Sequence, residues 1–546
     1  MFVRFFLYLN TIRYLKISQI YGRLIYKYKK PFTSSNLPNN IRQRKACFVR
    51  PIKKKSSLLK ENIFFFLNRR HNLSEIGWQG ENSSISKLWL YNLHYFDFLL
   101  DANTDKLDHY HKKLLVNWIN ENKIGYGVGW ESYPLSLRIV NWIKWDLKTG
   151  NLTEKCRLSL ATQCNFLSQK IEWHLLGNHL FKNAKALVFS GLYFKGRYAS
   201  LWLKKGLEII SDQLSEQTLA DGGNFELSTM YHSIFLEDLL DLYNMSLVFP
   251  GSIPHTEIRK WKKNIRKMLY WLKAMTHPDG DISFFNDASF EVSAKFSELM
   301  AYSKRLGIDY VAKIGNINHL DKSGYIRFHN NFADLFIDVA KVGADYIPGH
   351  AHADTLSFEL SLFGQRVFVN LGTSEYGNTS IRNIERSTES HNTVKINNIN
   401  SSEVWDSFRV ARRAEPYNLR IKSKNSNIEI ECEHNGYKRL KGKPIHHRKW
   451  KFSNTSIILE DKIKGSFDCA FGYLHLHPDI KIQKTKDKVW NLKLQNGNNL
   501  SVIFDHGDPE LIDSYFASEF GKRIKTSCIR IKFLHDRTRV NLRWNL

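Results

Sequence analysis

The hydrophobic pattern of the chain changes near residue 315, and this change limits the folds open to it. Between about 61 and 315, apolar residues recur at i, i+3, i+4 and i+7, the spacing of one helix face. The clearest segments lie near 107–121, 134–147, 155–174, 196–217, 230–248 and 255–275. Short breaks with Gly or Pro separate them, so we expect antiparallel helical hairpins in a bundle, solenoid or toroid. No repeat of fixed length in the sequence indicates a particular solenoid family.

After about residue 316 the segments become short and rich in β-branched residues, which predicts strands. They lie at 335–342, 355–363, 366–370, 393–397, 427–433 and 456–464. Phe363-Gly-Gln-Arg366 has the composition of a hairpin turn between two of them. The sequence therefore predicts a basic arm and connector (1–60), a helical domain (61–315) and an antiparallel β-domain, best described as a sandwich (316–546). Ligand sites favour the cleft between such domains.

Positive charge is concentrated in the first 60 residues, which hold fifteen Lys or Arg and no Asp or Glu, out of a net charge of +27. An acidic partner, an anionic membrane surface and a solvated tail all remain open for this arm. We expect no specific nucleic-acid partner, because no binding motif accompanies the charge. Apolar residues at helical spacing predict a basic amphipathic helix here, with no cleavable signal and no run long enough to span a bilayer: Val3, Phe6, Leu9, Ile12, Ile20 and Leu24. The six cysteines are scattered and indicate free thiols.

The stretch Pro348-Gly-His-Ala-His-Ala-Asp354 has the pattern of a loop entering a strand. In an extended segment, His350, His352 and Asp354 point to one face. Such a group suits a site held by a rigid strand. The alternative is a pair of hydrogen-bonded histidines in the core.

Two other stretches place polar residues at predicted helix starts. Gly177 ends one helix and Asn178 begins the next, so Asn178 and His179 are candidates to bind an anionic group at the helix N-terminus, unless Asn178 is only a cap. Tyr231 follows the Gly-rich turn at 221–223 on a predicted helix, where an isolated Tyr most often belongs to the core.

Two further groups are candidates for binding. Trp130, Glu131, Tyr133 and Arg138 suggest a sugar-stacking platform with a carboxylate-binding Arg, although an ordinary helix start at Pro134 explains them equally. His391 lies just before a predicted strand. Together with His350 and His352 it offers nitrogen ligands for a transition metal, with Asp354 or Asn370 as an oxygen donor.

Taken together, these motifs resemble the heparinase II/III-like polysaccharide lyases, a family that includes related alginate lyases. The resemblance covers roughly residues 75–546, and the order of its motifs agrees with that family. The matching pieces are Gly-Asn178-His, Gly-Gly-Asn-Phe-Glu-Leu-x3-Tyr231, His350-Ala-His352-Ala-Asp, Asn370-Leu-Gly-Thr and Ser-His391-Asn-Thr-Val. It implies an incomplete (α/α) toroid followed by an antiparallel β-sandwich.

The activity implied by the resemblance is β-elimination from an acidic, uronate-containing polysaccharide. The resemblance implies that Asn178 neutralises the uronate carboxylate with the help of His179. It also implies that Tyr231 acts as the acid, or as both the base and the acid. His350 is then a base or a charge stabiliser, and Tyr376 is a further residue near the substrate. A Tyr needs a cationic or hydrogen-bonding environment to act as a base at neutral pH.

The resemblance also suggests one zinc ion as the candidate cofactor. Zinc-bearing relatives use positions that correspond to His352, Asn370 and His391. Asn370 departs from the pattern, since a neutral amide oxygen compensates a dication less well than a carboxylate. Asp354 is a substitute ligand.

The stretches at 370–377 and 402–413 look like a branch of the family associated with bacterial surface-polysaccharide assembly. The alternative function is therefore a non-lytic carbohydrate-binding or accessory protein that keeps the lyase fold. Family resemblance favours the periplasm, whereas the N-terminus without a cleavable signal favours the cytoplasm.

Overall fold

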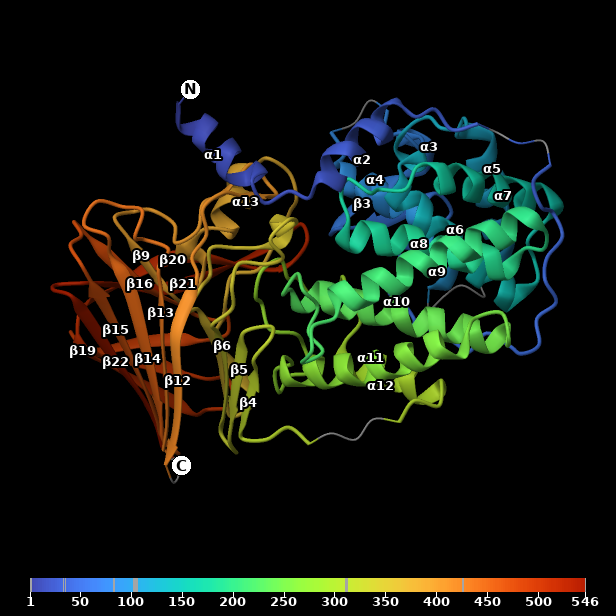
Figure 1. Ribbon diagram of the computed structural model, residues 1–546. Helices are drawn as coiled ribbons and strands as arrows, with labels where there is room; N and C mark the ends of the chain where they lie inside the picture. Colours follow the sequence, from blue (N-terminus) through green and yellow to red (C-terminus); the bar gives the residue numbers. More distant parts are fainter. Residues whose placement is uncertain are drawn as a thin grey trace.

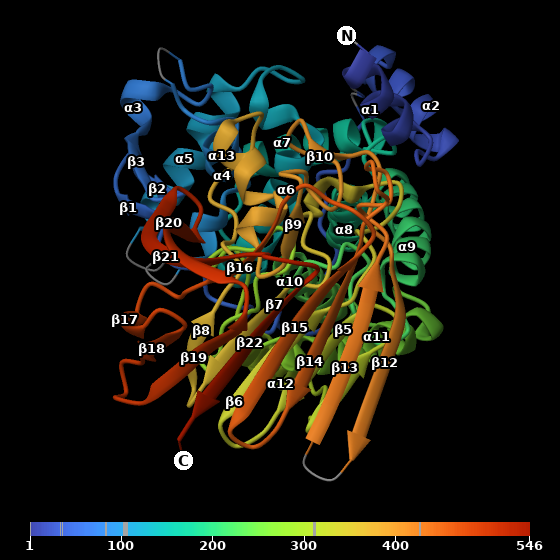
Figure 2. The same ribbon diagram turned by 90° about the vertical axis from the view of Figure 1, so that its left-hand side faces the viewer.

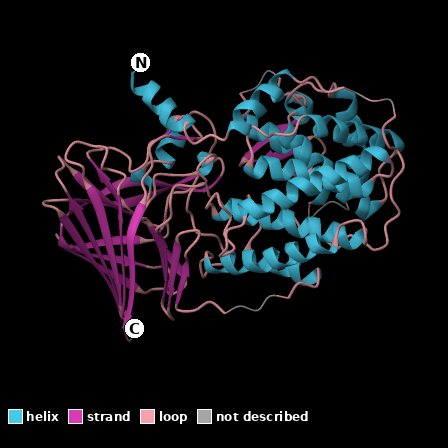
Figure 3. Ribbon diagram, in the orientation of Figure 1, coloured by secondary structure: helices cyan, strands magenta, loops and turns pink. Residues whose placement is uncertain are grey.

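The computed structural model describes residues 2–32, 34, 36–81, 84–101, 107–309, 313–424 and 427–545, in which a helical half precedes a β-rich half (Figures 1 and 3). Helices α1 (Phe2–Ile12) and α2 (Ile17–Tyr28) open the chain. The helical half contains α3 (Leu73–Ile76), α4 (Lys87–Tyr95), α5 (Asp108–Glu121), α6 (Ser132–Thr149), α7 (Glu154–Gln169), α8 (Gly177–Tyr193), α9 (Arg197–Gln217), α10 (Thr229–Val248), α11 (His255–Ala274) and α12 (Phe296–Arg305).

Helices of this half pack against their neighbours in the chain and also against the helix after next. α6 packs on α8, α8 on α9 and on α10, and α10 on α11. Local signals set their ends: Gly150 closes α6 in the left-handed conformation, and the Ser228 side chain caps α10 by accepting the N–H of Tyr231. One prediction was wrong, because the helical region does not begin at 61. β1 (Leu58–Lys60), β2 (Ile63–Phe66) and β3 (Arg69–Asn72) form a small antiparallel sheet there.

The β-rich half is built mainly from two facing sheets whose strand neighbours are all antiparallel (Figure 2). The first contains β4 (Ile317–Leu320), β5 (Tyr325–His329), β6 (Ala333–Asp338), β7 (Phe358–Leu362) and β8 (Gln365–Phe368). The second runs in the order β12 (Pro416–Lys424), β13 (Asn427–His434), β14 (Ile445–Phe452), β15 (Ser456–Lys464), β22 (Arg537–Trp544), β19 (Asn499–His506), β18 (Val489–Lys493) and β17 (Lys481–Lys486). Phe328 from the first sheet stacks on Phe452 from the second at 4.7 Å, and one buried apolar cluster joins the two sheets. This packing makes a sandwich.

A third sheet connects the sandwich to the helices. It consists of β20 (Asp508–Glu519), β21 (Lys522–Lys532), β16 (Ala470–His475) and β9 (Val394–Ile396). Phe516 on β20 and Phe520 beside it belong to the buried apolar cluster of the helical half. The remaining elements are α13 (Ser380–Glu385) and the hairpin of β10 (Val404–Trp405) and β11 (Arg409–Val410).

The hairpin turn predicted at 363–366 is confirmed. Phe363 and Gly364 join β7 to β8 with φ values of 50° and 81°, the two left-handed residues of a tight two-residue turn. His350 to Asp354 do not form the single extended face that was considered for them, although the strand predicted at 355–363 is present as β7. Residues Pro348–His350 form a 3-10 turn, and β7 begins only at Phe358. The side chains of this stretch are therefore not held on one strand face, and they have separate partners.

Candidate active site

Asn178 and His179 begin helix α8 next to the loop that carries His350. Gly177 has φ +50°, a left-handed conformation that favours glycine, and a Cβ there would lie 2.5 Å from the end of the Ile347 side chain. The exposed N–H groups and positive dipole end of a helix N-terminus favour a negative group. That position already receives one carboxylate, because the Asn178 N–H donates to Glu226 Oε1 at 3.3 Å.

Glu226 joins this helix N-terminus to His350. Its Oε2 lies 2.5 Å from His350 Nδ1, and its side chain is buried. The next residue, Leu227, holds the left-handed conformation (φ 59°) that a β-carbon disfavours. Because a carboxylate accepts hydrogen bonds, it keeps the proton on Nδ1 and leaves the lone pair of a neutral ring on Nε2. Nε2 has no hydrogen-bond partner in the part of the chain that the structure describes, so it is available to a ligand.

The Tyr231 ring lies flat against the His350 ring, with centroids 3.7 Å apart and planes 13° apart. Its hydroxyl is 2.9 Å from the hydroxyl of Tyr376, and either group can be the donor. Burial raises the pKa of Tyr231 well above its usual value, and the nearby Tyr376 and Tyr133 raise it further. Tyr231 is therefore a neutral phenol at neutral pH.

Tyr133 and His179 complete the group. The Asn178 side-chain amide donates to the Tyr133 hydroxyl at 3.0 Å, and the Tyr133 ring lies 4.5 Å from the His179 ring. Burial alone lowers the pKa of His179, but the charge and hydrogen bond of Glu172, 3.1 Å away, raise it overall. His179 thus carries more positive charge near neutral pH than an ordinary histidine.

The structure thus brings together six of the predicted site residues in one connected group: Asn178, His179, Tyr231, His350, Tyr133 and Tyr376. Sequence reasoning missed Glu226, although it lies inside a motif quoted above. Its signal was an acidic residue in a Gly-rich turn directly before a helix.

Two predicted substrate-binding residues are corrected, because they lie in the helical core. Trp130 is 4% exposed and packs against Trp118 and Phe166. Arg138 is fully buried, donates from Nε to Gln163 at 2.9 Å, and stacks over the Trp118 ring. Neither side chain can reach a sugar.

Glu131 lies at the edge of the group. It forms an ion pair with Lys87 at 2.9 Å and accepts a hydrogen bond from the Tyr91 hydroxyl. The Tyr91 ring stacks near that of Tyr133, with centroids 6.5 Å apart, and the charge of Glu131 also contributes to the raised pKa of His179.

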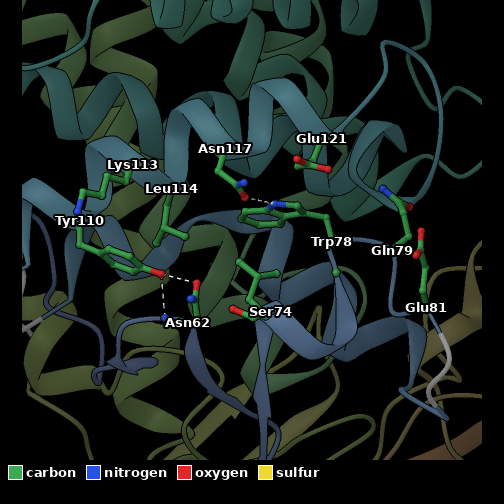
Figure 4. A pocket seen from close by; sticks show the side chains of 12 residues that line it. Asn62, Ser74, Trp78, Gln79, Glu81, Tyr110, Lys113, Leu114, Asn117 and Glu121 are labelled. Carbon is green, nitrogen blue, oxygen red and sulfur yellow. Dashed lines mark hydrogen bonds between the residues drawn. The ribbon is translucent and has the colours of Figure 1, made fainter.

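A cavity of about 430 Å³ lies elsewhere in the helical half, between α3 and α5 (Figure 4). Trp78 donates to Asn117 on one side of it, and Tyr110 bonds to Asn62 on the other. None of the predicted catalytic residues lines it, so the cavity is separate from the site.

Both halves of the chain match one known family. The family model described as "Heparinase II/III N-terminus" matches residues 148–306, and the one described as "Heparinase II/III-like, C-terminal" matches residues 314–545. The chain belongs to the heparinase II/III-like polysaccharide lyase family. The heparin-sulfate lyase of Bacteroides stercoris is 27% identical over 357 residues, which are 60% of this chain and 50% of that protein. The heparin-sulfate lyase of Pedobacter heparinus is 24% identical over 361 residues, with the same shares.

The match therefore spans about half the length of these curated relatives. The crystal structure of heparinase III aligns with a TM-score of 0.70 at 17% identity, over 96% of this chain and 89% of that one. It confirms the predicted fold of an incomplete (α/α) toroid followed by an antiparallel β-sandwich.

The zinc site that this family suggests does not fit the residues present. His352 Nδ1 and His391 Nε2 lie 3.0 Å apart, near the roughly 3.3 Å that separates two nitrogens on one tetrahedral zinc. The other ring nitrogen of His352 is bonded to Asp287 at 2.8 Å, which is also the usual outer partner of a metal-bound histidine. The misfit lies at the third ligand, because the Asn370 oxygen is a neutral amide oxygen that accepts the backbone N–H of Asn392. Among the residues that the structure describes, no three His, Cys, Asp or Glu are grouped to hold a metal ion.

In this chain a buried ion pair lies beside the histidine pair. Arg382 contacts both oxygens of Asp287, and Asp287 in turn accepts from His352. Burial raises the pKa of Asp287, but Arg382 and His352 lower it well below its usual value overall. Asp354, the proposed substitute ligand, instead accepts the backbone N–H of Asn286 at 3.3 Å. These residues support the site structurally, and no catalytic step below passes through a metal.

Proposed function

We propose that the chain is a polysaccharide lyase that cleaves an acidic, uronate-containing polysaccharide by β-elimination. One observation carries the proposal: Glu226 holds the imidazole of His350 against the Tyr231 ring, next to the N-terminus of α8. The resemblance to heparin-sulfate lyases supports the same chemistry.

The uronate carboxylate binds at the start of α8. Asn178 supplies an amide donor and His179 a positively charged ring, and both add to the dipole of the helix. Neutralising this carboxylate makes the hydrogen on the adjacent C5 more acidic, because the developing negative charge spreads onto it.

His350 removes the C5 proton through Nε2. The Glu226 carboxylate keeps the other proton on Nδ1 and stabilises the imidazolium that forms. In this arrangement the buried carboxylate orients the histidine and does not itself take the proton.

Tyr231 protonates the leaving oxygen. Its raised pKa keeps the hydroxyl proton in place until negative charge develops on O4. The electron pair of the C5–H bond then forms the C4=C5 double bond, the C4–O4 bond breaks, and O4 takes the phenolic proton. His350 afterwards loses its proton to solvent, and Tyr231 regains one. Because the resting phenol is neutral, the acid role suits Tyr231 better than the base role.

The test follows the ultraviolet absorbance of the unsaturated uronate over a panel of uronate-containing glycans. Tyr231→Phe should abolish turnover while binding of the same glycan persists. Tyr110→Phe, which alters a tyrosine in the separate cavity, is the matched control and should leave turnover unchanged. Full activity of Tyr231→Phe would refute the proposed acid. Glycan binding by the unaltered protein without any turnover would favour the accessory function instead.

A further inference from the structure

Helix α2 turns its apolar side outward. Ile17, Ile20, Tyr21, Leu24, Ile25 and Tyr28 follow the spacing of one helix face, and all are between 40% and 84% exposed. Helix α1 continues the pattern with exposed Phe5, Phe6, Leu9 and Ile12. An apolar stripe on a soluble protein normally faces the core, and a contiguous exposed patch marks an interaction surface.

The opposite side of α2 is the one that contacts the protein. The Gln19 amide donates to the carbonyl of Tyr346 at 3.1 Å, and the Tyr26 ring packs 4.4 Å from that of His174. A Cβ at Gly22 would lie 3.1 Å from the backbone of Trp173, so the two segments touch closely. The small and polar face is therefore fixed against the protein, and the apolar stripe cannot turn inward without breaking these contacts.

The charge around the stripe has one sign. Arg4, Arg13, Arg23, Lys27, Lys29 and Lys30 are exposed, and no Asp or Glu occurs in the first 60 residues. Lys16 differs from them in having an acidic partner, Glu216 of α9. A surface that is both apolar and basic is complementary to the boundary between anionic headgroups and acyl chains.

We propose that the outward face of α1 and α2 docks on the surface of an anionic lipid bilayer. No described helix has the length and apolar character needed to cross a membrane, so the contact is peripheral. A second copy of the chain fits this face less well, because pairing the two stripes would bring their positive charges together.

The docking face lies beside the candidate site. Tyr8 of α1 packs on Trp405 at 4.9 Å, and Arg413 stacks over Tyr14, so α1 is held by the segment that includes Phe408. Phe408 packs on Tyr376 and its ring is 6.4 Å from that of His350. α2 holds Tyr346, four residues before His350. In Figure 1, α1 lies over the β-rich half and α2 over the helical half, and Figure 2 shows both along the same edge. A docked molecule would therefore act on polysaccharide close to the membrane.

The experiment measures co-sedimentation of the full chain with vesicles of phosphatidylcholine, with and without phosphatidylglycerol. We expect binding only to the vesicles that contain phosphatidylglycerol, and release as NaCl is raised from about 0.1 M to 1 M, because screening shortens the Debye length from about 10 Å to 3 Å. Leu24→Asp should lower the partition coefficient at least tenfold, roughly the effect of keeping one leucine out of an apolar phase.

Leu201→Asp on α9 is the matched control, since Leu201 and Leu24 are 53% and 54% exposed. It should bind vesicles like the unaltered chain, and both variants should keep turnover of soluble glycan if the proposed lyase activity is correct. Equal binding to both kinds of vesicle, or equal loss in both variants, would overturn the proposal. The proposal would also be overturned if sedimentation velocity showed dimers without lipid and Leu24→Asp dissociated them, because a second copy would then occupy the face.

Discussion

Replacing Glu226 with glutamine is expected to lower kcat by roughly 30- to 1,000-fold with little change in KM. The Glu226 carboxylate and the imidazolium formed at His350 have charge centres about 4 Å apart. Their electrostatic attraction is about 4 kcal/mol at an effective dielectric constant near 20. Part of the imidazolium charge has developed in the transition state, so the substitution should raise the activation free energy by about 2–4 kcal/mol. At a factor of ten in rate per 1.36 kcal/mol, this gives the expected fall in kcat. Substrate binding does not need the charge, because in the proposed reaction His350 takes up its proton only when C5 is deprotonated.

The geometry adds a second effect in the same direction. Glu226 Oε1 accepts the Asn178 N–H, so a glutamine that keeps this bond must place its NH2 group against His350 Nδ1. That amide can only donate, which moves the ring proton to Nε2 and removes the lone pair that acts as base. The tautomer change lowers kcat and kcat/KM together, as expected for a contribution made in the transition state.

The assay is the initial rate of unsaturated uronate formation, with thermal unfolding by circular dichroism as the folding control. Glu172→Gln is the comparison, because it removes a carboxylate bound to the other histidine of the site, His179. A Glu226→Gln protein that folds normally and keeps kcat within about threefold of the original would refute the orienting role. A loss of kcat matched by a large fall in unfolding temperature would show that Glu226 acts through stability alone.

Three further predictions follow from the site. Because Glu172 raises the pKa of His179, His179 loses its charge only as the pH rises through that raised value, so Glu172→Gln should make KM begin to increase at a lower pH than in the original protein. Dialysis against EDTA should leave both turnover and unfolding temperature unchanged, because among the described residues no third His, Cys, Asp or Glu joins the His352–His391 pair as a metal ligand; a fall in either would show a bound metal. Trp130→Ala should destabilise the fold by about 3–5 kcal/mol, measured by chemical denaturation, without changing KM of the folded protein; a selective increase in KM would restore Trp130 as a substrate contact.

Much of the candidate site was accessible from the sequence because each part has a local signal. Gly177 is the first residue of α8, one before the predicted start at Asn178, although it does not end the preceding helix, which stops at Gln169. The Gly-Gly pair at 222–223 precedes the helix of Tyr231, and Pro348-Gly349 marks the turn at His350. Breaks of this kind depend on backbone restrictions of single residues, which a sequence displays directly. The family pattern then indicated that these separate breaks lie in one site.

The missing and incorrect assignments depend on tertiary contacts. Glu226 and His350 are 124 residues apart, and nothing local shows that the carboxylate reaches the ring. Arg138 has the composition of a carboxylate-binding residue, but the rotation of α6 turns it inward to Gln163. Which face of a helix is buried inside a helical domain is decided by all its neighbours, so a single charged residue near a helix start is weak evidence of exposure.

The two halves of the chain contribute unlike parts of the proposed reaction, so their relative position must be fixed closely. The helical half supplies Asn178, Glu226 and Tyr231, whereas His350 comes from the β-rich half. A displacement of about 1 Å between reacting groups can cost about 100-fold in rate.

The strained backbone at Leu227 shows how this position is maintained. Its carbonyl accepts hydrogen bonds from the Tyr325 hydroxyl of β5 at 2.7 Å and from the Asn286 amide at 2.9 Å. A left-handed leucine costs roughly 1–2 kcal/mol, which two buried hydrogen bonds of about 1 kcal/mol each can offset. One of the two donors, Tyr325, comes from the β-rich half, so this half helps to stabilise the turn that directs Glu226 toward His350. Catalytic geometry and domain packing depend on the same few contacts, so a change at Tyr325 should affect both together.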